Sequence, residues 1–112
     1  MTEEAKKRKE MPVFMGFMAY FPKAMMEVAK VSFIGNEQHH PGTPLHWDKS
    51  KSTDEADAGE RHHLNHAQGV IYDSDGQLHL AKHAWRAMAE LERFLDGLEV
   101  EDGRDKKDAL GE

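Results

Sequence analysis

The sequence predicts an all-α fold, a small helical bundle of three main helices with an apolar segment before them. A chain of 112 residues fits one small domain. Apolar side chains recur at helical spacing in residues 23–34, 52–67 and 76–96, and turn-forming residues separate these stretches. Because the apolar area is limited, we expect a homo-oligomer, a dimer or a tetramer, to complete the bundle.

The first helix is predicted over residues 23–34. Pro22 suits its opening turn, and Gly35 with Asn36 predicts its end. Glu27 lies among apolar neighbours on the helical wheel. We therefore expect its carboxylate to be partly desolvated, or to be neutralised by a metal ion or a base.

A loop and a second helix follow. Residues 39–47 contain turn-forming residues together with histidine and tryptophan, so they predict a loop that shapes a ligand pocket. The second helix should begin near Ser52 or Thr53, where a hydroxyl caps the free N–H groups. It should end at about Ala67.

Residues 76–96 give the clearest helical pattern, after a tight turn at 73–76. One face is apolar and is expected to face the core: Leu80, Ala84, Ala87, Met88, Leu91, Phe94 and Leu95. The opposite face is polar and is expected to face away from it: His79, Lys82, Arg86, Glu90 and Arg93. The apolar segment 11–21 is expected either as extended chain over the bundle or as a short helix.

Composition indicates how the chain is divided and which functions are excluded. We expect a flexible charged arm at 1–10, a helical domain at 11–96 and a flexible acidic tail at 97–112. The net charge of −6 argues against non-specific binding to nucleic acid or to an anionic membrane. The absence of cysteine excludes disulfides, thiolate zinc sites and cysteine nucleophiles. No apolar run approaches the roughly 20 residues of a membrane span, so a cytoplasmic protein is expected.

The second predicted helix carries a compact acidic and basic stripe. Asp54, Asp57 and Arg61 fall on one side of it at helical pitch. Two carboxylates one turn apart suit a hard divalent cation, and the arginine suits a phosphate. The alternative is an exposed helix face with a salt bridge from Asp57 to Arg61, and composition alone favours that alternative.

Histidines and cations add further candidates. Pairs at four-residue spacing, His62 with His66 and His79 with His83, would permit zinc, but the glutamate of the H-E-x-x-H motif is missing. We interpret His62, His79 and His83 as phosphate donors, supporting partners or metal ligands.

The cationic side chains of the third predicted helix differ in their expected roles. Lys82 and Arg86 are candidate triphosphate contacts, whereas Arg93 is expected to be solvated. Trp47 could stack on a base, and packing is favoured for Trp85. No glycine-rich phosphate loop is present, so side chains and a bound metal must bind any phosphate.

Four segments in order carry a resemblance. They are P-K-A-M-M-E-V-A-K-V at the start of 22–35, H-P-G-T-P-L-H-W at 40–47, S-T-D-E-A-D at the start of 52–62, and D-S-D-G-Q-L-H-L-A-K-H-A-W-R-A at 73–87. Over roughly residues 11–95 the chain resembles the phage-type, MazZ-like dATP/dGTP diphosphohydrolases of the all-α MazG-like superfamily. The general MazG pattern, E-x-x-E on one helix and E-x-x-D on the next, is not present literally.

The resemblance implies hydrolysis of a purine deoxynucleoside triphosphate, dGTP or dATP, to the monophosphate and pyrophosphate with Mg²⁺ or Mn²⁺. It also implies a role in phage 2-aminoadenine nucleotide metabolism, in the host cytoplasm. The expected metal ligands are Glu27, Asp54 and Asp57. The expected catalytic residues are Glu27, Asp57, Arg61 and His62. The expected substrate contacts are Asn36, His46, Trp47, Arg61, His79, Lys82 and Arg86.

Two other classes stay open at this point. A non-enzymatic, His-rich helical module would bind nucleotide, metal or a partner protein without turning over any nucleotide. A structural zinc protein would carry stoichiometric zinc and would unfold when the zinc is chelated.

Overall fold

The structure is a computed structural model that describes residues 1–51 and 53–100. Its elements in chain order are helix α1 (Glu3–Lys9), a short π-helix η1 (Phe14–Met18), and helices α2 (Pro22–His39), α3 (Glu55–Ala67) and α4 (His79–Val100). Within the described ranges there is no strand, only an isolated bridge between Tyr72 and Leu78. The all-α prediction is confirmed.

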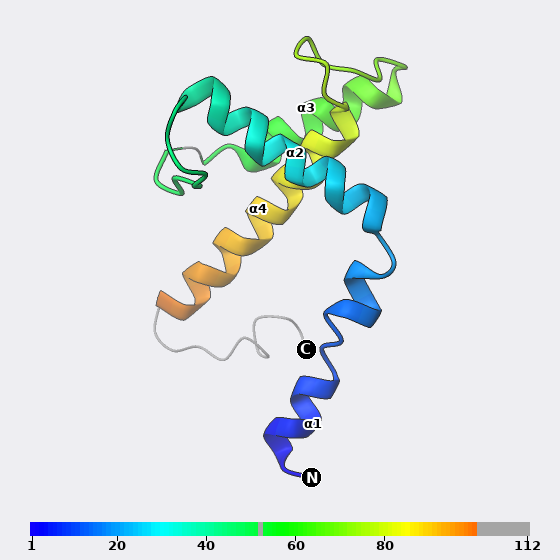
Figure 1. The fold of residues 1–112 in the computed structure, drawn as a ribbon, viewed down its shortest axis with the longest axis vertical. Helices are drawn as coiled ribbons and strands as arrows, with labels where there is room; N and C mark the ends of the chain where they lie inside the picture. Colours follow the sequence, from blue (N-terminus) through cyan, green and yellow to red (C-terminus); the bar gives the residue numbers. More distant parts are fainter. Residues whose placement is uncertain (52, 101–112) are drawn as a thin grey trace.

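Helices α2, α3 and α4 form the packed part of the molecule. α3 lies against the N-terminal half of α4, and α2 crosses the same half of α4 (Figure 1). α1 and η1 extend away from this crossing. Of the two forms expected for residues 11–21, the structure shows the short helix.

Helix α2 runs further than predicted. It continues through Gly35 and Asn36 to His39, so the predicted end at Gly35 was wrong. The side chain of Asn36 explains the continuation, because it does not compete for the helix backbone. Its Nδ2 donates instead to the carbonyl of Thr43, at 3.1 Å. The chain then turns at Gly42, whose φ of +80° favours glycine.

The starts of the other two long helices differ slightly from expectation. Helix α3 begins at Glu55 with Asp54, rather than Thr53, at its N-cap, and the Asp54 side chain forms no cap bond. Ser52 lies outside the described residues. Helix α4 begins at His79 rather than at Gly76, because Gly76 belongs to the preceding turn with a φ of +83°. Beyond the predicted end at residue 96, α4 continues to Val100.

The predicted orientation of α4 was wrong. Apolar side chains that were expected in the core are half exposed: Met88, Leu91 and Phe94 each keep 51% of their surface. The polar face instead turns inward, since His79 is only 4% exposed. Arg86 and Arg93 are likewise largely covered.

Two features of α3 explain this inversion. Glu55 is buried and supplies counter-charge to the arginines of α4. Ala58 and Gly59 are small, so the two helices approach closely. A Cβ added at Gly59 would lie 3.1 Å from the Cβ of Arg86. The face of α4 that packs inward is therefore determined by its ion pairs with Glu55 and by the close contact of α3 with α4. The spacing of apolar residues along α4 does not determine it.

The apolar core of one chain is thin. Of the residues that the structure describes, the buried apolar ones are small apart from one leucine: Ala58, Ala81, Ala89 and Leu98. Residues 3–9 form α1, in which no residue is buried. Among the described residues, no helix has the length and apolar character needed to cross a bilayer.

Candidate functional site

A cavity of about 770 Å³ opens between α2, the loop after it, and the first turns of α3 and α4. This volume lies in the range of small-molecule sites, roughly 300–1,000 Å³. Its walls include Asn36 of α2, Trp47 of the loop, Glu55 of α3, and Trp85 and Arg86 of α4. Segments far apart in the sequence therefore contribute to one concave surface.

Two tryptophans form the aromatic wall. The rings of Trp47 and Trp85 meet edge to face, with centroids 5.4 Å apart. Nε1 of Trp85 donates to the Ser32 hydroxyl at 2.7 Å, which fixes α4 to α2. Nζ of Lys49 lies 5.0 Å from the Trp47 ring centroid, a cation–π distance. Trp85 thus packs as expected, and it also lines the cavity.

Glu55 is a buried carboxylate that lines the cavity. It is only 4% exposed and accepts a 2.8 Å hydrogen bond from Nη1 of Arg86. Arg93 forms an ion pair with the same carboxylate and has its guanidinium 5.6 Å from the centroid of the Trp47 ring. The prediction that Arg93 is solvated was wrong.

Sequence reasoning missed Glu55 because it followed the Asp54 and Asp57 stripe. The sequence nevertheless contains a sign that Glu55 is buried. At three- and four-residue spacing, Glu55, Ala58 and Gly59 share one face of α3, and the two small residues mark the face that packs. A carboxylate on such a face needs a cationic partner, and the arginines of α4 supply it.

Lys82 lies between two carboxylates at the start of α4. Its Nζ is 2.7 Å from Asp73 and 2.8 Å from Asp75. Burial alone would lower the pKa of Lys82, but the hydrogen bonds to the two carboxylates raise it. The hydrogen bond from Lys82 lowers the pKa of Asp73. Burial opposes ionisation of Asp75, yet hydrogen bonds from Lys82 and Gln77 hold its pKa far below the usual range.

Replacement of Lys82 by methionine should destabilise the fold by about 2 kcal/mol at pH 7, because two partly buried carboxylates lose their shared donor. Asp73 and Asp75 have lowered pKa values in the folded state. Their stabilising contribution is therefore present above about pH 4 and is lost as the pH falls through the folded-state values. The stability gap between wild type and Lys82→Met should narrow at acid pH.

Thermal denaturation at pH 7 and pH 3 measures this gap. Lys6→Met is the matched control, because the pair of Lys6 with Glu3 is exposed and contributes little. A Lys82→Met protein as stable as the wild type at pH 7 would contradict the assignment.

His62 and His79 approach each other beside the cavity. Their Nδ1 atoms are 2.9 Å apart, so one ring donates a proton and the other accepts it. Burial, reinforced by the positive charge of Lys82, lowers the pKa of His62. The neutral imidazole is therefore favoured. With Asp73, these two histidines form a group whose ligand atoms lie within 4.8 Å of one another.

The three predicted metal ligands do not gather in one chain. Glu27 pairs with Lys30 at 3.3 Å, which neutralises it with a base. Asp54 lies 3.9 Å from Arg61, in place of the salt bridge expected for Asp57. Asp57 is exposed. In the described part of the chain, these carboxylates form no group within 4.8 Å and do not line the cavity.

The predicted substrate contacts divide into two sets. Those that line the cavity are Asn36, His46, Trp47, Lys82 and Arg86. Arg61 and His79 do not line it, although His79 contacts His62, which does.

By fold and lining, this is an all-α domain with a small-molecule site whose two tryptophans, arginine and lysines suit a nucleotide. The chain is a member of the dATP/dGTP diphosphohydrolase family, because the sequence model of that family's N-terminal region matches residues 2–103. Members of this family are deoxynucleoside triphosphate pyrophosphohydrolases, so this protein is an enzyme of that type. No curated protein and no solved structure matches the chain. Family membership decides against the two non-enzymatic classes.

Proposed function

We propose that this protein hydrolyses dGTP or dATP to the deoxynucleoside monophosphate and pyrophosphate, and that the nucleotide binds in the cavity beside Trp47 and Arg86. Family membership supports the reaction class. The observation that carries the location is the cavity itself, which brings two indole rings and three cationic side chains, Lys51, Lys82 and Arg86, to one concave surface. Indole rings suit a purine, and cations suit a triphosphate.

Asn36 is the proposed contact to the base. It lies in the cavity wall and is only 7% exposed. Its Nδ2 donates to Thr43, but its Oδ1 has no hydrogen-bond donor. A buried acceptor without a donor costs free energy, and the exocyclic amino group of a purine would satisfy it. The aromatic wall favours the larger purine rings, and this acceptor suits a base that carries an exocyclic amino group.

Arg86 and Lys82 are the proposed phosphate contacts in the cavity. Each already forms an ion pair, Arg86 with Glu55 and Lys82 with Asp73 and Asp75. Their guanidinium and ammonium groups are thus held in place before a ligand arrives. In the reaction, water adds to the α-phosphorus, the bond between that phosphorus and the α–β bridging oxygen breaks, and pyrophosphate leaves with that oxygen. Positive charge near the leaving oxygens stabilises the charge that develops there.

Mg²⁺ or Mn²⁺ is the proposed cofactor, with Glu27, Asp54 and Asp57 as its protein ligands. Carboxylate oxygens are the donors that Mg²⁺ prefers. The geometry of a single chain does not fit, because the three side chains do not converge. We therefore assign no catalytic step to the ion. Glu27, Asp57, Arg61 and His62 remain the proposed catalytic residues.

A homo-oligomer is part of the proposal. The thin core of one chain and the half-exposed Met88, Leu91 and Phe94 support it, since association would cover this surface. The proposed setting is a phage-infected cytoplasm, in which the dGMP product enters synthesis of 2-aminoadenine nucleotides. The order of the four motifs supports this setting.

Product analysis tests the reaction. The protein is incubated with each of the four deoxynucleoside triphosphates and Mg²⁺, and the products are separated. We expect monophosphate and pyrophosphate in equal amounts, fastest with dGTP or dATP. Release of orthophosphate would overturn the assigned chemistry, and preference for a pyrimidine would overturn the proposed base.

Replacement of Asn36 by alanine tests where the base binds. Removal of a buried acceptor should lower kcat/KM for dGTP and dATP, whose bases carry an exocyclic amino group, by about 10-fold or more, with a smaller loss for dTTP, whose base has none. Gln38→Ala is the matched control, because Gln38 also lines the cavity but is exposed and donates to Asp75. An equal loss for all four nucleotides, or none, would remove Asn36 from base recognition.

A further inference from the structure

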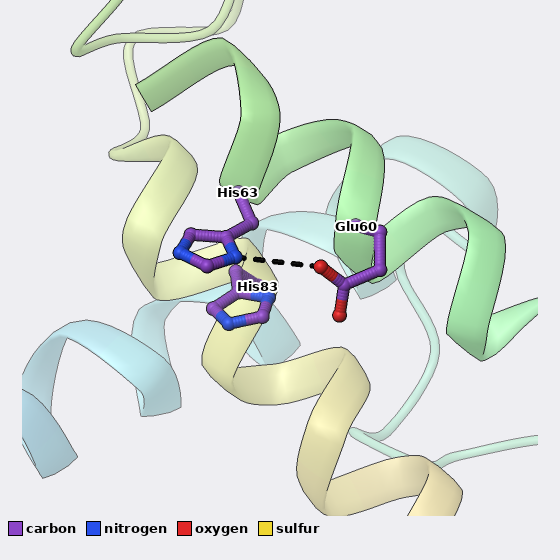
Figure 2. Close-up of side chains that lie close together, drawn as sticks. All are labelled: Glu60, His63 and His83. Atoms are coloured by element: carbon purple, nitrogen blue, oxygen red, sulfur yellow. Dashed lines mark hydrogen bonds and ion pairs between the residues drawn. The ribbon is translucent and has the colours of Figure 1, made fainter. Parts of the chain in front are cut away.

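A second cluster of ligand-type side chains lies outside the cavity. Glu60 and His63 of α3 face His83 of α4, and one ligand atom from each lies within 4.8 Å of the others (Figure 2). None of the three lines the cavity. We propose that Glu60, His63 and His83 form a binding site for Zn²⁺ or a similar divalent transition-metal ion, which bridges α3 and α4.

The placement on α3 follows from helical spacing. Glu60 and His63 are three residues apart, so their side chains project from one face, as in the Glu-x-x-His pairs of helical metal proteins. Nδ1 of His63 lies 3.3 Å from Oε1 of Glu60. Both side chains are more than half exposed, at 54% and 72%. They can therefore adjust by rotation to bring their donor atoms onto an ion.

His83 is oriented by the backbone of the opposite helix. Its Nδ1 lies 3.0 Å from the carbonyl oxygen of Gly59. A carbonyl only accepts, so Nδ1 carries the proton and Nε2 presents a lone pair. Metal-binding histidines are commonly held this way, with the second ring nitrogen donating to a carbonyl or a carboxylate. The hydrogen bond thus fixes the tautomer that a metal ion requires.

The two imidazoles of the cluster also lie close together. The rings of His63 and His83 are stacked, with centroids 4.3 Å apart and planes inclined by 14°. Two imidazoles and one carboxylate are a donor set that suits Zn²⁺ and neighbouring transition metals better than Mg²⁺. Three protein ligands would leave one position of a tetrahedral ion open to water.

Charge distinguishes this cluster from the His62, Asp73 and His79 group. There, Lys82 lies 2.7 Å from Asp73 and already occupies the carboxylate that a metal ion would need. Among the described residues, the ion pair of Glu60 is with His63, and no lysine or arginine pairs with Glu60. The Glu60 cluster is therefore the better cation site of the two.

Metal binding by tag-free, metal-stripped protein tests the proposal. Titration with Zn²⁺ should show one ion per chain at this site, and Co²⁺ should give the visible absorption of a tetrahedral complex. Because the ion bridges two helices, saturating Zn²⁺ should raise the Tm by about 5 °C or more. Activity is not used as a readout, so this test stands apart from that of the proposed function.

Variants locate the ion. His63→Ala and Glu60→Ala alter exposed side chains and should fold normally, and each should weaken Zn²⁺ binding at least about 10-fold and abolish the Tm rise. Two control variants should keep the wild-type Zn²⁺ affinity and the Tm rise. One is His39→Ala, which alters an exposed histidine of α2 outside both clusters, and the other is His62→Ala, which alters the competing group. Zn²⁺ binding that survives His63→Ala, that is lost in His62→Ala, or that is absent from the wild type would overturn the proposal.

Discussion

Asp57→Asn should lower kcat/KM for dGTP and dATP by about 100-fold or more, as expected when a carboxylate that acts in the reaction loses its charge. The change preserves side-chain shape, and Asp57 is exposed on α3. Helix content and Tm should therefore stay at wild-type values. Steady-state assays of pyrophosphate release, together with circular dichroism, measure both quantities.

Glu90→Gln provides the control for this prediction, because Glu90 is an exposed carboxylate of α4 away from the proposed site. Its activity should match that of the wild type. If Asp57→Asn is nearly as active as the control, Asp57 does not belong to the site. The carboxylates within the cavity, with Glu55 first among them, would then be the ones to test.

Glu55→Ala should lower the free energy of unfolding by about 3–5 kcal/mol, because Arg86 and Arg93 lose the buried carboxylate that neutralises them. In a domain of this size such a loss lowers Tm by more than about 10 °C. Urea denaturation followed by circular dichroism measures it. Glu90→Ala, at an exposed position, should change stability by less than about 0.5 kcal/mol.

A double replacement sharpens this second prediction. If the pair carries the effect, Glu55→Met combined with Arg93→Met should destabilise less than the sum of the two single changes, because no uncompensated charge remains from that pair. Additive losses would show instead that Glu55 does not stabilise the fold through its pair with Arg93.

Periodicity predicted the helices well and their contacts poorly. The three main helices lie close to where the spacing of apolar residues places them, because that spacing depends on local geometry. The inward face of α4 could not be predicted in this way. It depends on Glu55 and Gly59, which belong to another helix and act only after the two helices meet.

Residue type predicted much of the cavity wall. Asn36, His46 and Trp47 were selected because polar and aromatic residues in and beside a turn-rich loop shape pockets, and the structure lines the cavity with them. The role of Glu55 was missed because an acidic residue within an acidic stretch gives only a weak local sign of burial. Only the two arginines, some thirty and forty residues later, show why it is buried.

The link between Glu55 and Arg86 has a consequence for ligand binding. An arginine on a free surface samples many rotamers, and ordering it costs up to about 2 kcal/mol of conformational entropy. In this protein the carboxylate of Glu55 holds the guanidinium in one place, so that entropy is lost when the chain folds. A phosphate that meets Arg86 would therefore encounter a side chain that is already ordered, and the free-energy cost of binding would be smaller by that amount.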